Sequence, residues 1–367
     1  MGPAPVWRAI LLAAVLAAPS AVAWAAPKPD IAELKAAPIA VHSSAIRTFT
    51  RFDDAKRQPL SSKLTFRGGL VLTSPSPNFG GWSGLVVSDD AKSFLAISDS
   101  GVWLTGTLAY DGTRLSGITH AELGPVLDRD GKPISRKRGR DAESIALASG
   151  TLDDGTAFIG FEQRHRIERY AVTRSGLSAD RGSIPLPRQA RRMRANQGFE
   201  AITVMKGGPY KGSLIAFSER LHDASRNHTG WLWTRKGPVV VHLKDIGDYD
   251  ITDLSSLDDG TLFVLERRFR WTEGLKMRLR RIAPAELRPG GTAIGETLME
   301  ADLNDQIDNM EGLSVTRLKS GEVLVSMISD DNFNHFLQRT LLLQFTVNDA
   351  DKQKPGGGIS APGEYSR

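Results

Sequence analysis

The 367-residue chain contains no cysteine. This absence excludes disulfide bonds, thiolate metal sites and a cysteine nucleophile, so an ordinary hydrophobic core must stabilise the fold. The chain also has no P-loop, no G-x-G-x-x-G and no H-E-x-x-H motif. Nucleotide-dependent and zinc-protease chemistry are therefore not expected. The stretch GWSGL around Ser83 lacks the glycine two places after the serine that a nucleophile elbow requires.

The N-terminus carries an apolar run from Ala9 to Ala18, preceded by the single basic residue Arg8. The run is too short for a membrane-spanning helix. Because Ala23-Trp24-Ala25 fits an A-x-A cleavage site, we expect residues 1–25 to be a signal peptide that is cleaved after Ala25. The mature protein would then be periplasmic or secreted, without a stable membrane span. A retained N-terminal anchor is the alternative.

The net charge of +5 is partly local, because basic residues cluster between Arg136 and Asp141 and between Arg188 and Arg194. Such clusters can bind nucleic acid, but a secreted protein rarely meets nucleic acid. Two interpretations remain: these stretches are solvated loops, or they attract an anionic substrate or surface. The expected partner of the protein is a small anionic or ester substrate. We expect a monomer and no nucleic-acid partner.

Helical periodicity is scarce, and short β-rich runs alternate with Gly, Asp, Asn and Pro. Five segments repeat one pattern: a polar or acidic residue, a small residue, an apolar strand, a turn, and a second strand that ends in an acid. The leading residues are 60, 57, 53 and 58 positions apart, namely Ser83, Glu143, Glu200, Asp253 and Glu311. The trailing acids are Asp99, Glu162, Glu219, Glu266 and Asp330.

A period above 50 residues with about four strand-like runs per repeat predicts an all-β fold, a β-propeller with five four-stranded blades. In the second repeat the runs lie near 143–149, 156–162, 166–172 and 181–186. The last repeat has three such runs, and Leu64–Thr73 before the first repeat offers the fourth, so an N-terminal strand is expected to close the ring. Six blades remain possible if residues before Leu64 and near 292–301 form another. The propeller is expected over residues 64–348, after an extended lead-in at 26–63 and before a disordered Gly/Pro-rich tail at 349–367.

Equivalent residues of successive blades meet around the central axis, so the leading acids are expected to form a ring. Carboxylates that converge in this way repel one another unless protons or cations compensate. A hard divalent cation, with Ca²⁺ the first choice, suits such oxygen ligands. The predicted metal ligands are Glu143, Glu200, Asp253 and Glu311. The alternative is that each carboxylate accepts backbone hydrogen bonds and locks one blade to the next.

Acids at the strand ends of FEQR, SERL and LERRF are each followed by arginine. These arginines are structural ion-pair partners or grips for an anionic substrate. The predicted substrate-binding residues are Arg164, Arg220, Arg267 and Arg268. A loop histidine is often only a surface residue, but His222 can also act as a general acid or base. The candidate catalytic residues are Glu200, Glu162, Glu219 and His222.

The stretches FGGWSGL, DAESIAL, NQGFEAITV, FSER, LERRF and NMEGLSV resemble the secreted phytase-like propellers of the "esterase-like activity of phytase" family. The resemblance runs from about Leu64 to Val347. It implies a propeller with a polar central site that hydrolyses phosphoesters or other esters. Ser83 and Asp253 depart from the repeated leading glutamate.

Three hypotheses about function follow. The first is a secreted, Ca²⁺-dependent hydrolase of phosphate or other esters that acts at the central axis. The second is a non-catalytic propeller that binds a ligand or a protein in the same place. The third is a lactonase-type ester hydrolase, which the sequence does not separate from the first.

Overall fold

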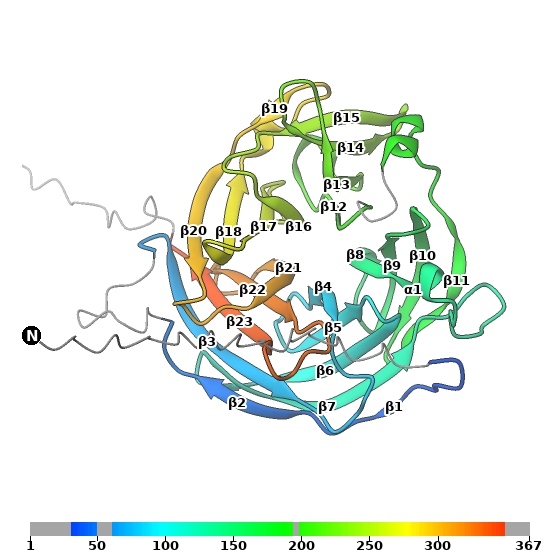
Figure 1. Cartoon of the computed structure of the whole chain (residues 1–367), viewed down its shortest axis with the longest axis vertical. Coiled ribbons are helices and arrows are strands. Elements are labelled where there is room, and N and C mark those ends of the chain that lie inside the picture. Colours follow the sequence, from blue (N-terminus) through cyan, green and yellow to red (C-terminus); the bar gives the residue numbers. More distant parts are fainter. Residues whose placement is uncertain (1–30, 50–60, 194–197, 349–367) are drawn as a thin grey trace, which may run out of the picture.

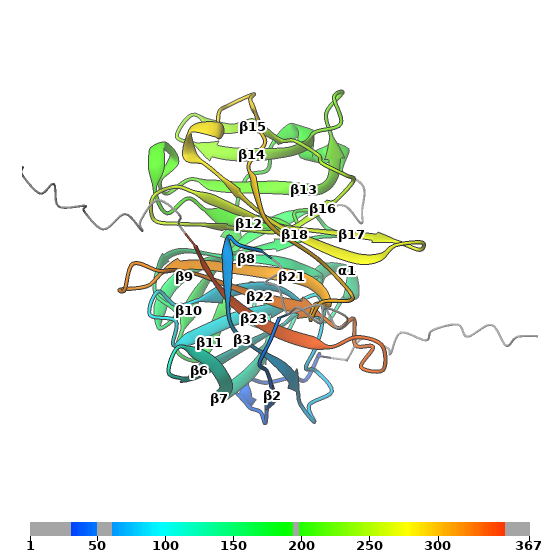
Figure 2. The ribbon, with the colours of Figure 1, turned by 90° about the vertical axis from the view of Figure 1, so that its left-hand side faces the viewer.

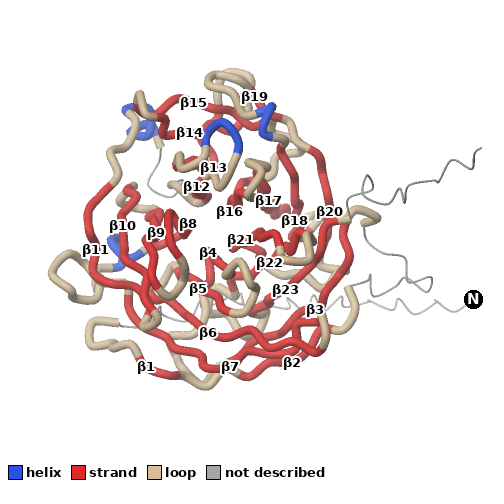
Figure 3. The backbone as a smooth tube through the Cα atoms, turned by 180° about the vertical axis from the view of Figure 1, so that it is seen from behind, coloured by secondary structure: helices blue, strands red, loops and turns tan. Residues whose placement is uncertain are grey.

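The computed structural model describes residues 31–49, 61–193 and 198–348. Within them the strands form five sheets arranged around a central axis (Figure 1), so the prediction of an all-β, five-bladed propeller is confirmed. The expected signal peptide, the C-terminal tail and parts of the lead-in lie outside the described residues. Helical turns are few and short (Figure 3), and no helix among the described residues is long and apolar enough to cross a membrane.

The first two blades follow one another along the chain. From the axis outward, the first contains β4 (Trp82–Val87), β5 (Ser93–Ser98), β6 (Val102–Asp111), β7 (Arg114–Pro125) and the short β1 (Ala37–Pro38). The second contains β8 (Ala142–Gly150), β9 (Asp154–Phe161), β10 (Arg166–Thr173) and β11 (Gly176–Ser183), with α1 (Lys137–Arg140) before it and the 3₁₀ turn η1 (Arg188–Arg192) after it. Its last strand begins at Gly176, five residues before the predicted start at 181. The reason is the tight turn at Arg174 and Ser175, after which Gly176 takes a φ of +90°.

The third and fourth blades share the segment between residues 284 and 302. The third contains β12 (Ala201–Val204), β13 (Leu214–His222), β14 (His228–Thr234), β15 (Gly237–Leu243) and the parallel two-residue β19 (Thr292–Ala293). The fourth contains β16 (Asp250–Ser256), β17 (Leu262–Arg270), β18 (Gly274–Ile282) and β20 (Glu296–Asp302). Short 3₁₀ turns occur at η2 (Gly208–Tyr210) and η3 (Pro284–Glu286). Figure 2 shows the hairpin of β17 and β18 reaching beyond the neighbouring strands.

The fifth blade combines strands from both parts of the chain. It contains β21 (Asn309–Arg317), β22 (Val323–Asp330), β23 (Thr340–Val347), β3 (Leu64–Thr73) and β2 (His42–Ile46). Strand β3 pairs antiparallel with β23, from Leu64 opposite Val347 to Leu72 opposite Thr340. The segments considered for a sixth blade instead extend the five sheets: β19 and β20 join blades three and four, and β1 and β2 add outer strands to blades one and five.

The hydrophobic core is divided into five clusters, one between each pair of neighbouring blades. Leu95 and Ile145 belong to the cluster between the first two blades, for example, and Ile215 and Ile251 to the cluster between the third and fourth. The other three clusters lie between the remaining pairs of blades. Each fully buried aliphatic side chain contributes about 1.5–3 kcal/mol. Because every blade is packed on both faces, the ring holds its innermost strands in fixed positions.

Small residues let the innermost strands approach one another closely around the axis. Strands β4, β8, β12, β16 and β21 each contact the next, and β21 contacts β4. A Cβ atom on Gly84 would lie 3.0 Å from the backbone nitrogen of Ile145, and one on Gly312 would lie 3.0 Å from the carbonyl carbon of Gly84. The glycine after the leading position of the first and fifth repeats is therefore a packing requirement.

Candidate functional site

Three sets of equivalent residues occupy the same end of the five innermost strands. A register shift at the start of the strand leaves one extra residue, for example Glu143 between the pairs Ala142–Phe161 and Ser144–Gly160. Such a bulge re-aims its side chain. We call this the bulge position; it is occupied by Ser83, Glu143, Thr252 and Glu311 in four blades. In the third blade Glu200 takes it, between the Gly198–Glu219 backbone hydrogen bond and the Ala201–Phe217 pair.

The two other sets face each other across the first two strands of each blade. The entry position lies two residues before the bulge position and is occupied by Gly81, Asp141, Gly198, Asp250 and Asn309. It pairs or shares a backbone hydrogen bond with the facing position on the second strand, occupied by Asp99, Glu162, Glu219, Arg267 and Asp330. The entry position was missed in the sequence, although the DAES stretch shows Asp141 two residues before Glu143.

The fourth blade corrects the sequence alignment by one residue. Its register shift falls between Ile251 and Asp253, so Thr252, not Asp253, occupies the bulge position. Asp253 is fully buried, and its carboxylate accepts the backbone N–H of Leu254 at 2.8 Å and of Leu313, in the next blade, at 2.7 Å. The predicted metal ligand therefore makes the blade-locking hydrogen bonds that were the alternative. Aligning the repeat by acidic character alone caused the shift.

The same shift changes the second strand of the fourth blade. Arg267 takes the facing position that an acid occupies in the other blades. Glu266, predicted as the trailing acid, is fully buried and paired with Arg278 (Nε to Oε2, 2.7 Å) and Arg280 (Nε to Oε2, 2.8 Å). Arg280 also donates to the carbonyl oxygens of Lys244 and Ile294. Glu266 thus belongs to a buried ion-pair network that holds the fourth blade to its surrounding loops.

Five carboxyl groups come together around the second and third blades. Potential ligand oxygens of Asp141, Glu143 and Glu162 all lie within 4.8 Å of one another, and so do those of Glu162, Glu200 and Glu219. Glu162 belongs to both groups. We call these five residues the acid cluster. Glu143 is the second residue of β8, Glu162 directly follows β9, Glu219 lies within β13, and Glu200 directly precedes β12.

The acid cluster is held at high electrostatic cost. Burial raises the pKa of Glu143 and Glu200 well above the usual carboxyl range, and the neighbouring Asp141 and Glu219, respectively, raise it further. Burial, with the charges of Asp141 and Glu219, raises the pKa of Glu162 to about 7. Burial also raises the pKa of Glu219 to about 7, against the opposing effect of Arg220. At neutral pH such a cluster is stabilised by bound protons or by a cation.

The composition of the acid cluster fits a hard divalent cation. All its donor atoms are carboxylate oxygens, which Ca²⁺ and Mg²⁺ prefer over nitrogen or sulfur ligands. Glu143 and Glu200 retain some solvent contact, and Glu162 and Glu219 are 9% and 5% exposed. The residues present therefore fit the predicted cation, in a different ligand set from the one predicted. Of the predicted ligands, Glu143 and Glu200 lie in the cluster, Glu311 lies beside Arg267, and Asp253 lies apart.

The structure separates the four predicted substrate-binding arginines. Arg267 donates to Asn309 (2.7 Å) and Glu311 (3.0 Å), and its Nη2 lies 3.9 Å from Glu219 Oε1. Arg220 donates two hydrogen bonds to the carboxylate of Asp250, at 3.0 and 2.6 Å, and its Nη2 lies 3.2 Å from Glu219 Oε1. These two arginines therefore border the acid cluster.

The other two arginines lie elsewhere. Arg268 donates to Glu273 and to the carbonyl of Gly247, and its guanidinium lies 5.0 Å from the ring centre of Tyr249. Arg164 is exposed and lines a separate groove of about 960 Å³. The fourth predicted catalytic residue, His222, lies with His228 and Asp245 in the third blade.

Comparison with known proteins gives one family match. The model of the phytase-like family, described as esterase-like activity of phytase, matches residues 77–333. No curated protein matches the chain. Among solved structures, the propeller of Dos1 is 8% identical over 82% of each chain, with a TM-score of 0.33. The matched family region includes every residue of the acid cluster.

Proposed function

Because the chain belongs to the phytase-like family, esterase-like activity of phytase, we propose that it is a divalent-cation-dependent hydrolase of phosphate or other esters, with the acid cluster as its active site. A family name transfers a fold more safely than a reaction, so the proposal depends on the cluster itself. The observation that carries it is the pair of three-carboxylate groups that share Glu162. Such an arrangement would supply the oxygen ligands for one divalent cation or two, which would act there as a Lewis acid.

The charge balance favours a cation-dependent site over a site that binds an anionic ester without a cation. The bulge, entry and facing positions together hold Asp141, Asp250, Glu143, Glu200, Glu311, Asp99, Glu162, Glu219 and Asp330 against the single guanidinium of Arg267. A phosphate would be repelled by this excess of carboxylates. When bound, a divalent cation supplies the positive charge that attracts the ester and polarises its oxygen.

We assign the residues of the chain separate roles in this proposal. Asp141, Glu143, Glu162 and Glu200 hold the cation through their carboxylate oxygens. Glu219, the member of the cluster beside Arg220 and Arg267, accepts a proton from the attacking water through a carboxylate oxygen. Arg267, in contact with Glu311 and near Glu219, donates hydrogen bonds to the oxygen that gains charge.

The proposal is tested with chelator-treated mature protein and a panel of phosphomonoesters, carboxylic esters and lactones, each with and without Ca²⁺. We expect turnover only with the cation, and a loss of about 100-fold or more in kcat for Glu219→Gln. Glu200→Gln should raise the cation concentration needed for half-maximal rate. Glu33→Gln, an exposed residue far from the repeat positions, is the matched control and should leave both unchanged.

The outcomes separate the three functional hypotheses. Bound cation without turnover of any substrate would contradict the hydrolase and support a binding propeller. Turnover of lactones alone would identify a lactonase. Turnover that persists in chelator would overturn the role of the cation.

We further propose that the protein acts outside the cytoplasm, on the strength of the N-terminal sequence. Extracellular calcium modules commonly bind at 10⁻⁴–10⁻³ M, so a site of modest affinity would be filled there. Expression with the full N-terminus and sequencing of the exported protein should give Ala26 as the first residue. An intact N-terminus on protein recovered from the cytoplasm would contradict export.

A further inference from the structure

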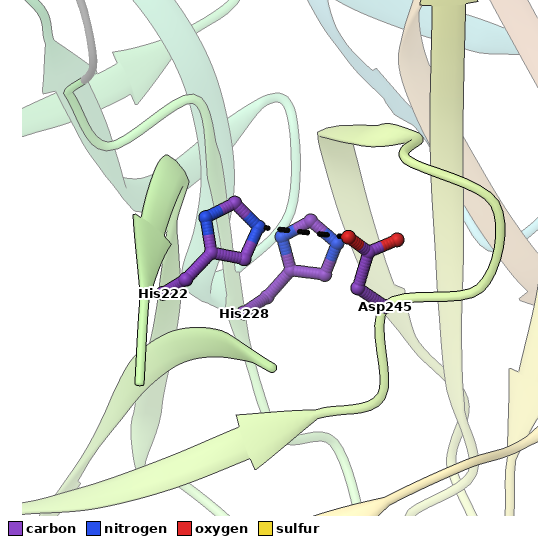
Figure 4. Close-up of side chains that lie close together, drawn as sticks. All are labelled: His222, His228 and Asp245. Atoms are coloured by element: carbon purple, nitrogen blue, oxygen red, sulfur yellow. Dashed lines mark ion pairs between the residues drawn. The ribbon is translucent and has the colours of Figure 1, made fainter. Parts of the chain in front are cut away.

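A second cluster of potential ligands lies in the third blade, formed by one hairpin and the segment that follows β15. His222 is the last residue of β13 and His228 the first of β14, and the two face each other as a cross-strand pair. Asp245 comes two residues after the end of β15. Figure 4 shows the three side chains pointing toward one another.

The hairpin between the two histidines is rigid. The carboxylate of Asp223 accepts the backbone N–H groups of Ser225 and Asn227, both at 2.8 Å, and the side-chain amide of Asn227 at 3.0 Å. Asp245 is fixed in turn by the backbone N–H of Asp248 at 3.0 Å. The hairpin that joins the two histidines and the carboxylate of Asp245 are therefore held in place by groups outside the cluster.

The distances suit a small ion better than direct hydrogen bonds. The ring centres of His222 and His228 are 4.8 Å apart, and His222 Nε2 lies 3.8 Å from Asp245 Oδ2, too far for a hydrogen bond. One ligand atom from each residue lies within 4.8 Å of the others. Ligands of a tetrahedral zinc ion are about 3.3 Å apart, given Zn–N and Zn–O bonds of about 2.0–2.1 Å. Small side-chain adjustments would close this difference.

The histidine nitrogens point to a missing partner. His228 is fully buried, and neither of its ring nitrogens has a hydrogen-bond partner among the described residues. Nε2 of His222 is likewise buried and unpartnered in that part of the chain. Buried polar atoms without partners are rare in native proteins and need an explanation. A ligand that accepts nitrogen lone pairs would satisfy these atoms together.

His222 is already arranged as metal-binding histidines usually are. Its Nδ1 lies 3.1 Å from the carbonyl oxygen of Arg220, a contact in which only a protonated Nδ1 can donate. This tautomer leaves the lone pair on Nε2, the atom nearest Asp245. A backbone carbonyl that fixes the second ring nitrogen in this way is typical of metal ligands.

We propose that His222, His228 and Asp245 form a binding site for a transition-metal ion of the zinc class, separate from the acid cluster. Two imidazoles and one carboxylate suit zinc, whereas calcium and magnesium take oxygen ligands. Three protein ligands leave a fourth coordination position for a water molecule.

The surrounding charges are compatible with a bound cation. Glu266 and Asp245 add negative charge near His228, and Arg280 adds positive charge. The guanidinium of Arg280 is bound to the Glu266 carboxylate, which offsets its repulsion.

The test uses untagged mature protein, stripped of metal and then saturated with Ca²⁺, so that zinc at the acid cluster is suppressed. Zinc is titrated in competition with a chromophoric chelator. We expect one equivalent to bind wild type and Glu162→Gln equally, and at least tenfold weaker binding for His222→Ala. His42→Ala, which removes an exposed histidine on β2, is the control and should match wild type.

A second measurement protects the test against a variant that misfolds. Wild type titrated with Co²⁺ should show the visible absorption of a four-coordinate nitrogen-containing site, and this absorption should be displaced by zinc. Either wild type that binds no zinc under these conditions, or His222→Ala and folded His228→Gln that bind it as tightly as wild type, would overturn the site.

Discussion

The third and fourth blades are neighbours whose first three strands follow in the same order, yet they present different residues at equivalent positions, with opposite charges at the facing position. The third places Glu200 and Glu219 at the bulge and facing positions, and the fourth places Thr252 and Arg267 there. Because Arg267 contacts Glu311 and approaches Glu219, the fourth blade supplies a built-in cation to a ring that is otherwise acidic. The propeller fold fixes where the side chain at each of these positions points, and the type of residue at the position decides its chemistry.

The fourth blade also shows how one step along a strand changes the role of a carboxylate. Side chains alternate between the faces of a strand. Glu266, one residue before the facing position, is buried between Arg278 and Arg280, whereas Glu219 in the third blade faces other carboxylates. An acid at a strand end is thus structural or functional according to its register. The predictions below test this difference.

The largest expected effect is on stability, and its sign should differ between the two blades. Glu266→Ala leaves two buried guanidinium groups without their partner and should destabilise the fold by about 3–5 kcal/mol. Glu219→Gln removes a carboxylate from a repulsive cluster and should stabilise metal-free protein at pH 8. Urea denaturation of both variants against wild type measures this. Equal destabilisation by the two changes would show that Glu219 is structural as well.

The next prediction concerns pH. Glu162 and Glu219 have a pKa of about 7 in the folded protein and 4.5 as the ordinary value, so between these limits the folded state binds more protons than the unfolded state. Stability of metal-free protein should therefore fall as pH rises from about 5 to 8, by on the order of 3 kcal/mol.

Thermal unfolding of the protein in chelator measures this loss of stability with pH, and saturating Ca²⁺ should make the loss smaller. Glu219→Gln should flatten the profile in chelator, while Glu33→Gln should reproduce the wild-type profile. A stability that is constant or increases over this pH range would contradict the raised pKa values.

Asp253 provides a smaller effect. Its carboxylate joins the fourth blade to the fifth through the N–H of Leu313, so Asp253→Ala should cost about 1–3 kcal/mol. Cation affinity should stay unchanged, because the residue lies outside the acid cluster. Chemical denaturation and Ca²⁺ titration of the same variant check both halves. Loss of Ca²⁺ binding by a folded variant would return Asp253 to the predicted ligand set.

The smallest expected effect is on affinity. Arg267→Gln removes the only cation at the facing position and should tighten Ca²⁺ binding severalfold, since less positive charge opposes the ion. The same change should lower the rate of hydrolysis if Arg267 stabilises the developing charge. Calorimetric titration and kinetics of one preparation separate the two consequences. Weaker cation binding would mean that Arg267 positions the cluster instead.

The sequence was sufficient for the fold because each blade repeats its own local signals. Apolar strands and tight turns recur in every copy, and glycines such as Gly84 and Gly312 mark the close approach of neighbouring innermost strands. Register at the fourth blade was not predictable from acidic character, since Thr252 occupies the bulge position there and the acid Asp253 comes one residue later. An alignment by position of residues 251–254 (ITDL) with residues 310–313 (MEGL) places Thr252, and not Asp253, opposite Glu311.

The site was predictable in part, for a related physical reason. Residues at repeat positions, such as Glu143 and Glu200, were identified because the propeller brings equivalent positions together. Glu162 and Glu219 were also selected, but their grouping with Asp141 depends on side-chain directions that sequence spacing does not give. The His222, His228 and Asp245 cluster depends on a hairpin and a later loop meeting, and no repeat signals that contact.

Calorimetric titration of Ca²⁺ into chelator-treated protein at neutral pH tests the central claim most directly, with Glu162→Gln as the comparison. Glu162 belongs to both groups of the acid cluster, so its replacement should weaken binding whether the cluster holds one cation or two. We predict saturable binding to wild type and at least tenfold weaker binding to a folded Glu162→Gln. The absence of binding to wild type, or equal affinity in both proteins, would contradict the acid cluster as a cation site.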